Sequence, residues 1–316
     1  MVGGNKNMSK ENTAVTKKKI KRCKEDVVFD AACFIILTLV LFVVAYPLYW
    51  VIISSISAPS AVSSGKVLLH PIGFTLKGYA EVFKNDQVMR GFLNSLIITF
   101  CGVMVNLIVT LPTSYALSRS NFSGKKPITI FYMITMFFGG GMIPTYLVVK
   151  NMQLLNTIWA LVLPGCLSVY NMIVARTFFK SNITEELYEA AEIDGCTQAR
   201  FFFQIALPLS KAIIAILVLY YGVGHWNSYF SALVYISDKA KYPLQLVLRN
   251  ILITNQTALS QTATTAAARA ALQEKQQLID VMKYSLIIIS SIPVLVMYPL
   301  VQKHFVKGVM IGSMKG

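Results

Sequence analysis

Six long stretches of the chain contain no Asp, Glu, Lys or Arg, and this spacing of the charges constrains the fold more than any other feature. A helix needs about 20 mostly apolar residues to cross the hydrocarbon core of a bilayer, and each stretch has about that length or more. We therefore predict an all-α, polytopic membrane protein. Its six transmembrane helices are expected within Ala31–Gly65, Gly91–Ser118, Pro127–Val149, Asn151–Ala175, Ala212–Ser237 and Tyr284–Gln302.

Two uncharged stretches can be interpreted in more than one way. A seventh uncharged stretch, Asn250–Ala268, is so rich in Asn, Thr, Gln and Ser that we do not expect it in lipid. The first stretch follows a basic segment and could be read as a signal peptide. Its apolar run, Ala31–Ile56, is too long for that and has no early cleavage site of small residues. We expect it to remain as a helix.

The composition supports a membrane protein and excludes a nucleic-acid partner. Charged residues make up 14% of the chain, against about 25% in soluble proteins, and hydrophobic residues make up 55%. Lys and Arg number 29 against 14 Asp and Glu. Proteins that bind nucleic acid are dense in charge, whereas this chain has few charges. In a membrane protein the excess of basic residues reports orientation instead.

Most of the Lys and Arg residues fall on one side of the membrane if the N-terminus is cytoplasmic. This places both termini in the cytoplasm. The expected organisation is a basic cytoplasmic tail over 1–28, a six-span membrane domain over 29–305 and a C-terminal cytoplasmic tail over 306–316. Within the membrane domain, 181–210 is a cytoplasmic loop and 238–283 is an extracellular loop.

Signals for catalysis are missing from the sequence. There is no GxxxxGK[ST] phosphate loop and no HExxH, and the 5 Cys residues form no CxxC pair. The predicted spans carry no acid or base from which a proton relay could be built. We predict that the chain is not an enzyme, holds no metal and binds no cofactor of its own.

The densest group of charges is acidic and lies in the predicted cytoplasmic loop. Asn182 and Glu185 have the spacing of a helix-capping pair, and early acids suit a helix N-terminus. Gly195 tolerates the left-handed conformation that ends many helices. We predict a short helix that ends at Gly195 and contains five of the chain's acids, Glu185, Glu186, Glu189, Glu192 and Asp194.

A second short helix is expected from Gln198 to about Ile205, with a break at Leu207-Pro208. At about 100° per residue, the first helix has an apolar face of Ile183, Leu187, Ala190 and Ala191 opposite Glu185, Glu189 and Glu192. Two helices joined by a glycine suit docking into the groove of another protein. The alternative is a helix lying on lipid headgroups, but such helices present Lys and Arg rather than carboxylates.

At these residues the chain resembles the permeases of ABC importers. Glu189-Ala190-Ala191, Gly195 and Ile205-x-Leu207-Pro208 match that family's EAA loop, EAA-x3-G-x9-I-x-LP, at every fixed position. Four further segments are similar to carbohydrate-uptake permeases, in particular those for complex oligosaccharides and polysaccharides. These are Gly140–Thr145, Gly224–Phe230, Tyr242–Leu246 and Gln302–Ser313.

The resemblance implies a type I ABC importer permease fold in a bacterial cell membrane. It implies four kinds of partner: a second, homologous permease, two copies of a cytoplasmic ATPase, an extracellular substrate-binding lipoprotein and a carbohydrate substrate. ATP and Mg would bind the ATPase. The loop with Glu189, Ala190, Ala191, Asp194 and Gly195, followed by Ile205, Leu207 and Pro208, would be the helix that couples ATP hydrolysis to alternating access. The C-terminal tail would contact the ATPases, and 238–283 would contact the binding protein.

Sugar contacts are expected from aromatic and hydrogen-bonding side chains on the fifth predicted span, namely Tyr221, Trp226, Asn227 and Tyr229. Trp226 has an alternative role as an anchor at the membrane interface. Asn227, if buried, needs a partner, which is either a neighbouring helix or a sugar. Asn106, Tyr132 and Asn171 are weaker possibilities. The resemblance also implies that one member of a permease pair can supply most of the contacts.

Two other functions compete with an ATP-driven permease. The first is a channel or secondary carrier that works without ATP, and co-purification of an ATPase distinguishes it. The second is a membrane assembly partner that binds an ATPase but moves nothing, and a reconstituted flux assay distinguishes that.

Overall fold

The computed structural model describes residues 24–258 and 266–313, and every regular element in these ranges is a helix. Residues 1–49 and residues 50–316 form two separate compact units. Most of the predicted basic tail, and the last three residues of the predicted C-terminal tail, lie outside the described residues. The α-helices are α1 (Lys24–Ser55), α2 (Pro59–Ser63), α3 (Lys77–Lys84), α4 (Asp86–Ser118), α5 (Lys125–Phe137), α6 (Met142–Asn151), α7 (Trp159–Val162), α8 (Val169–Asn182), α9 (Glu185–Ile193), α10 (Gln198–Phe201), α11 (Leu207–Leu209), α12 (Lys211–Trp226), α13 (Tyr229–Tyr235), α14 (Leu244–Ala258) and α15 (Ala266–Ser313).

Three described helices are long and apolar enough to cross a membrane: α1, α4 and the part of α15 over Gln276–Pro299. Two bent pairs also pass if each pair counts as one span. The α5–α6 pair bends by 113°, and 198–209 meets α12 at 79°. The described residues therefore offer up to five spans by length and composition. The predicted number of six is not confirmed.

The difference lies in the fourth predicted span, Asn151–Ala175. Helix α6 ends at Asn151, and Gln153 and Asn156 then adopt positive φ values of 56° and 62°. The short helix α7 follows, and the chain next runs without helix from Leu163 to Ser168 before α8 begins. Pro164 helps to explain the gap, because proline lacks an N–H and its ring hinders a continuing helix. A charge-free stretch predicts membrane depth but does not predict an unbroken helix.

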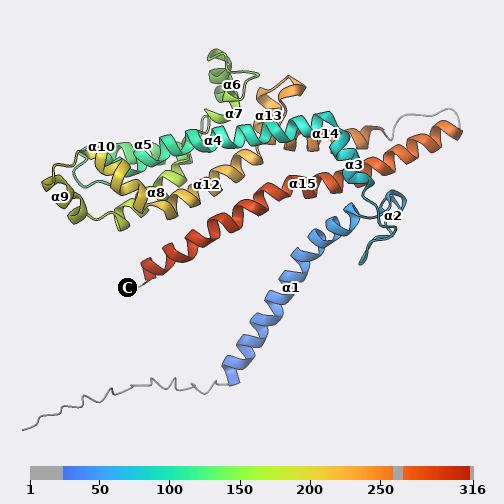
Figure 1. Cartoon of the computed structure of the whole chain (residues 1–316), viewed down its shortest axis with the longest axis horizontal. Coiled ribbons are helices and arrows are strands. Elements are labelled where there is room, and N and C mark those ends of the chain that lie inside the picture. The colour runs from blue at the N-terminus through green and yellow to red at the C-terminus, as the bar shows by residue number, and fades with distance from the viewer. Residues whose placement is uncertain (1–23, 259–265, 314–316) are drawn as a thin grey trace, which may run out of the picture. The chain divides into compact units, whose positions relative to one another are not determined.

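Helix α4 is the centre of the second unit, and in Figure 1 it runs alongside α8 and α12. Its buried face carries small or polar residues, whereas its other face carries exposed apolar side chains such as Leu93, Phe100 and Ile108. This reverses the pattern of a soluble protein. Helices in lipid associate through close approach and polar contacts, since the lipid is as apolar as leucine. The buried face contains Gly91, Ser95, Gly102, Asn106, Thr110 and Ser114.

The segment predicted as an extracellular loop, 238–283, is largely helical in its described part. It contains a 3-10 turn over Lys239–Lys241, helix α14 and the start of α15. Its beginning is fixed to α4: the Asn94 side chain donates to the Ala240 and Tyr242 carbonyls at 2.8 and 3.1 Å. The described parts of the polar stretch Asn250–Ala268, which we did not expect in lipid, belong to none of the candidate spans, and 259–265 lies outside the described residues.

Candidate functional site

Helix α9, which carries the acidic cluster, begins at Glu185, two residues later than an N-cap at Asn182 implies. Thr184 is the N-cap and its side chain makes no capping bond. Asn182 is the last residue of α8, and its side-chain amide donates to the Phe178 carbonyl at 3.0 Å. The predicted Asn182–Glu185 capping pair is therefore wrong. The amide was already used by the preceding turn of helix.

The predicted stop at Gly195 is confirmed. Gly195 has φ +76°, in the left-handed region that favours glycine. Its N–H donates to the Glu192 carbonyl and the next N–H, of Cys196, donates to the Ala191 carbonyl, both at 2.9 Å. These reversed bonds satisfy carbonyls that the end of a helix leaves open. Asp194 occupies the C-cap position. The glycine thus turns the chain from α9 towards α10.

The predicted apolar face of α9 is divided in the structure. Tyr188 and Ala191 are buried against the rest of the unit, together with Ile183 just before the helix. Leu187, Ala190 and Ile193 lie on a second face and are exposed, and Ile193 is 87% exposed. Leu187 and Ala190 of the predicted apolar face are therefore exposed, whereas Ile183 and Ala191 of that face are buried beside Tyr188. Glu189 is exposed beside these residues. We call Leu187, Ala190 and Ile193 the outer stripe.

Arg119, the first residue after α4, holds α9 in position. One guanidinium nitrogen lies 2.9 Å from the Glu185 carboxylate, and the guanidinium carbon lies 3.9 Å from the centre of the Tyr188 ring. The Arg119 side chain is only 12% exposed, so solvent screens these contacts less than it screens a surface pair. Arginine suits this place because its planar group can stack on a ring while pairing with a carboxylate. The sequence reasoning did not identify Arg119, although it is the first charge after the α4 stretch.

We call α9 and α10, joined at Gly195, the elbow. Its second helical segment runs past the predicted end near Ile205 and covers Gln198–Leu209. Helix α10 covers Gln198–Phe201, a π-helical turn follows over Phe202–Ala206, and α11 continues through Pro208. The bend comes at Ser210 instead, between α11 and α12. Ile205 and Leu207 are half-buried against the cluster that holds Tyr115 and Phe201, and Pro208 is exposed. The fixed Ile, Leu and Pro of the motif therefore lie on the joint between elbow and span.

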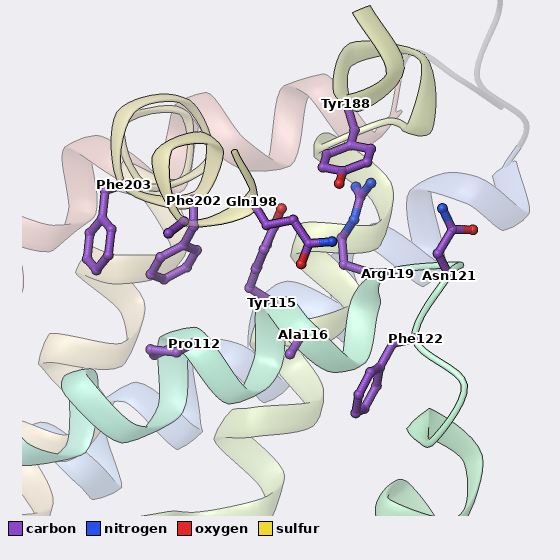
Figure 2. A pocket seen from close by; sticks show the side chains of 11 residues that line it. Pro112, Tyr115, Ala116, Arg119, Asn121, Phe122, Tyr188, Gln198, Phe202 and Phe203 are labelled. Carbon is purple, nitrogen blue, oxygen red and sulfur yellow. The ribbon is translucent and has the colours of Figure 1, made fainter. Parts of the chain in front are cut away.

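A cavity of about 420 Å³ opens between the end of α4 and the elbow. Figure 2 shows Arg119 below the Tyr188 ring, with Tyr115 and Gln198 beside it. Phe202 and Phe203 lie on one side of the cavity and Phe122 on the other. The Tyr115 and Phe202 rings are 5.0 Å apart between centroids. Five of the eleven residues that line the cavity are aromatic, so aromatic contacts are a large part of the packing between α4 and the elbow.

The structure separates the four residues expected along a sugar path. Trp226 is 2% exposed, donates its indole N–H to the Ser290 carbonyl at 2.9 Å and meets the Phe92 ring edge-on. It therefore packs α12 against α4 and α15. Tyr221 is also buried, and its hydroxyl lies 2.7 Å from the Thr110 hydroxyl.

Asn227 and Tyr229 lie at the end of α12 and the start of α13, and both are exposed. A buried amide would need a hydrogen-bonding partner, but the Asn227 side chain is exposed. Its amide nitrogen donates to the Val223 carbonyl at 3.1 Å, within its own helix end. Of the four, these two remain accessible to a ligand in the chain alone. Their contact with sugar stays a prediction.

Polar groups that hold α4 to its neighbours were weighed lightly or missed in the sequence. The Asn106 amide nitrogen donates to the Gly165 and Cys166 carbonyls at 2.9 and 2.8 Å, and its oxygen lies 2.6 Å from His225 Nε2. The sequence signal for this contact was the amide of Asn106 within the uncharged stretch Gly91–Ser118. In the described part of the chain, no three His, Cys, Asp or Glu side chains gather where they could hold a metal ion.

Curated relatives cover nearly the whole chain. The polygalacturonan/rhamnogalacturonan transport system permease protein YtcP of Bacillus subtilis is 36% identical over 91% of this chain and 98% of its own length. The protein LplC of the same organism is 39% identical over 92% of this chain and 95% of its own. No protein-family model matches the chain.

A solved structure shares the fold. The crystal structure of a bacterial ABC transporter involved in the import of the acidic polysaccharide alginate contains a chain with a TM-score of 0.80 and 27% identity. The match covers 90% of this chain and 99% of that one. The EAA loop, the helical architecture and these relatives agree. This chain belongs to the permease subunits of ABC sugar importers, and it is a multi-pass membrane protein.

Proposed function

We propose that the elbow of α9 and α10 is the contact through which a separate ATPase drives this permease. The outer stripe carries this proposal. Three apolar side chains, with Ile193 87% exposed, stand beside Glu189 on a helix that is otherwise fixed to the bundle by Arg119. Exposed apolar patches rimmed by polar residues are typical of protein interfaces. ATP and Mg would bind the partner, since this sequence has no phosphate loop.

The same assignment proposes a sidedness. The elbow, the α4–α5 connection and both termini would lie in the cytoplasm, and Asp238 with α14 would lie outside. The excess of Lys and Arg on the first side supports this orientation. The remaining partners would be a homologous permease and a substrate-binding lipoprotein that delivers sugar from outside.

The proposed cargo is an oligosaccharide that contains uronic acid. The similarity to a polygalacturonan/rhamnogalacturonan permease and to an alginate importer supports an acidic sugar. A net charge of +15 is compatible with anionic cargo. Other relatives are named for neutral or amino sugars, such as the galactooligosaccharide permease GanQ at 27% identity. The charge of the cargo is therefore the first property to test.

Uptake by the complete transporter in proteoliposomes tests the cargo. Oligogalacturonides are expected to enter when ATP and the binding protein are present, and neutral galactooligosaccharides of equal length are expected to compete at least about tenfold less well. Equal uptake of both would refute the acidic specificity. Uptake of either without ATP would favour a secondary carrier.

Thiol labelling in intact cells tests the sidedness. Ser123, between α4 and α5, is exposed and lies on the proposed cytoplasmic side. A Ser123→Cys variant is expected to resist an impermeant thiol reagent until the membrane is opened. Ala240, on the proposed outer side, provides the matched control, because Ala240→Cys should react at once. The reverse pattern would invert the topology.

A further inference from the structure

The cavity between α4 and the elbow has two chemically different ends. Figure 2 shows Pro112 and Phe203 towards one end and Arg119 and Asn121 towards the other. Arg119 is the first charged residue after the uncharged stretch 91–118 of α4, so it marks the level at which this helix leaves the hydrocarbon. Pro112 comes seven positions earlier, which places it about 10 Å deeper along the helix axis. The cavity therefore runs from the headgroup level into the apolar layer.

The deep end of the cavity is apolar and open. The Phe203 side chain is 65% exposed, and Pro112 and Ala116 on the α4 wall are exposed as well. The hydrocarbon core of a bilayer holds no water, so exposed apolar groups at this depth meet acyl chains. A chain that enters from the bilayer would find an aromatic ring on one side and α4 on the other.

The shallow end of the cavity offers hydrogen-bond donors. Arg119 Nη2 donates to the Glu185 carboxylate at 2.9 Å, whereas Nε and Nη1 have no acceptor among the described residues. These two nitrogens also remain accessible, because the fully buried side-chain atoms without a partner in the described chain belong to Ser54, Thr99 and Ser210. The planar guanidinium can pair on one edge with a carboxylate and on another with a phosphate. Arg119 can therefore hold Glu185 and an anionic ligand at the same time.

The first two residues of α5, Lys125 and Lys126, add positive charge at the shallow end. The Lys125 ammonium donates to the carbonyls of Arg119 and Ser120 at 3.2 and 2.8 Å, which fixes it next to the end of α4. Neither lysine forms an ion pair with a carboxylate in the described residues. Three cations thus stand at this turn against one carboxylate, that of Glu185. Basic pockets between membrane helices on the cytoplasmic side are typical sites for anionic lipid headgroups.

We propose that this cavity binds an anionic phospholipid. The lipid phosphate meets Arg119 and Lys125. One acyl chain lies against Pro112 and Phe203. The volume of about 420 Å³ is far more than an inorganic phosphate fills, and it lies within the range of about 300–1,000 Å³ that is common for ligand sites.

A lipid in this place joins two parts of the permease. One wall of the cavity is the end of α4, and another is formed by Tyr188 of α9 and Gln198 of α10. The bound lipid therefore holds the elbow to the span, in addition to the contact that Arg119 makes with Glu185. This inference goes beyond the proposed function, and it does not depend on which sugar is carried.

Tryptophan fluorescence in the complete transporter tests the binding. Phe203→Trp places an indole at the apolar end of the cavity, and the emission of the parent chain with its 3 native Trp residues is subtracted. The transporter is reconstituted in phosphatidylcholine. A rising fraction of that lipid is replaced by phosphatidylglycerol or phosphatidylcholine with brominated acyl chains, which quench an indole on contact.

Half-maximal quenching is expected at an about fivefold lower fraction of brominated phosphatidylglycerol than of brominated phosphatidylcholine. One basic side chain near an anionic headgroup contributes about that factor. Equal quenching by the two lipids would overturn the proposal, because the cavity would then have no preference for an anionic headgroup.

A variant that fills the cavity locates the effect. Ala116→Phe, in the Phe203→Trp background, places a ring at the deep end and leaves the Arg119 side chain unchanged. It should reduce the preference for phosphatidylglycerol to less than about twofold. Ala32→Phe is the control, because it makes the same substitution at an exposed alanine of α1. A full preference in the Ala116→Phe variant would overturn the proposal.

A charge variant serves as the second test, including the case in which Ala116→Phe does not assemble. Lys125→Gln combined with Lys126→Gln removes two positive charges and should weaken the preference for phosphatidylglycerol at least about threefold. Lys66→Gln combined with Lys77→Gln is the control, since it makes the same change in net charge at two exposed lysines outside the cavity. Equal losses in both double variants would show a general surface effect and would overturn the site.

Two further measurements separate the lipid from other occupants. Glycerol 3-phosphate carries the phosphate without the chains, and a large excess of it should not relieve the quenching. Displacement by this compound would assign the cavity to a soluble phosphate ester and overturn the lipid site. A preference that disappears whenever the ATPase is bound would overturn it too, because protein would then fill the cavity. Quenching needs neither ATP nor sugar, so a clear preference in a transporter that imports no sugar would contradict the proposed function alone.

Discussion

The elbow and the helix-free segment Leu163–Ser168 between α7 and α8, which we call the break, are two interruptions of helix that follow different physical rules. At the elbow, Gly195 turns the chain in water, and the left-handed backbone itself requires a glycine. At the break, no residue needs an unusual φ, and the interruption is held by side chains from distant parts of the sequence, above all Asn106. The first interruption is therefore determined by the local sequence. The second depends on the packing of α4 and α12.

The two regions also differ in what they expose. The elbow presents apolar side chains, the outer stripe, on a helix whose other face is anchored by Arg119. The break presents backbone. An exposed apolar stripe in water calls for a protein partner, whereas exposed backbone at membrane depth calls for water or protein. The comparison predicts that elbow variants act on coupling and that variants around the break act on the packing and assembly of the helices.

The largest effect is expected at Gly195. Gly195→Trp forces a bulky L-residue into the left-handed region and fills the turn between α9 and α10, so ATP-driven uptake should be abolished. Gly195→Ala should lose less, because a side-chain carbon there meets nothing within 4 Å and only backbone strain of about 1–2 kcal/mol remains. Uptake and co-purified ATPase are measured together. Gly124→Ala, at a glycine with an ordinary φ, is the control. Normal uptake by the Gly195→Trp variant would refute the coupling role of the elbow.

Trp226→Ala is expected to reduce the amount of folded permease. Trp226 is 2% exposed and bonds to the Ser290 carbonyl, so its loss leaves a cavity among α12, α4 and α15. Such truncations cost about 3–5 kcal/mol in protein cores. Thermal stability in detergent measures the effect. Trp159→Ala provides the comparison at a residue that is 43% exposed. Equal stability of the two variants would contradict this packing role and support direct contact of Trp226 with the sugar.

Arg119→Met should weaken the packing of α9 against α4 without unfolding the helix bundle. It removes the ion pair to Glu185 and the stacking on Tyr188, together worth about 2 kcal/mol at a half-buried site. We expect slower uptake with the ATPase still bound, and Arg119→Lys should lie between wild type and Arg119→Met. The control is Lys84→Met, which breaks an exposed ion pair to Glu81 and should change nothing measurable. An Arg119→Met variant with full uptake would show that α9 needs no such anchor.

The smallest effect is expected at Ser114, where α4 meets α8 between the two regions. Ser114→Ala removes the bond to the Met172 carbonyl and should cost about 1 kcal/mol or less, as is usual for hydrogen bonds between membrane helices. Thr113→Val is the neighbouring control, because the Thr113 hydroxyl bonds only within its own helix. A shift of a few degrees in unfolding temperature for Ser114→Ala alone fits the account. Identical shifts would argue that α4 and α8 are not held by this contact.

The sequence predicted those features that depend on composition or on local backbone geometry. Charge-free stretches located α1, α4 and α15, and Gly195 located the turn of the elbow. It did not predict which residue of α9 turns inward, because Tyr188 is selected by the Arg119 guanidinium that stacks on it. Nor did it predict the break, because the bonds from Asn106 join residues that lie 59 and 60 positions apart. Long-range polar contacts leave little trace in hydropathy.

The central claim is that the outer stripe of α9 seats in a separate ATPase. Photo-crosslinking from Ile193 tests it most directly, using Ile193→Cys in a Cys-free chain with a benzophenone attached to the thiol. The matched control is Ile143→Cys on α6, where the native side chain is 68% exposed and lies outside the elbow. The account predicts that illumination joins the Ile193→Cys variant, and not the Ile143→Cys variant, to a nucleotide-binding ATPase subunit. Adducts with lipid alone from the Ile193 position, in a complex that still hydrolyses ATP, would contradict it.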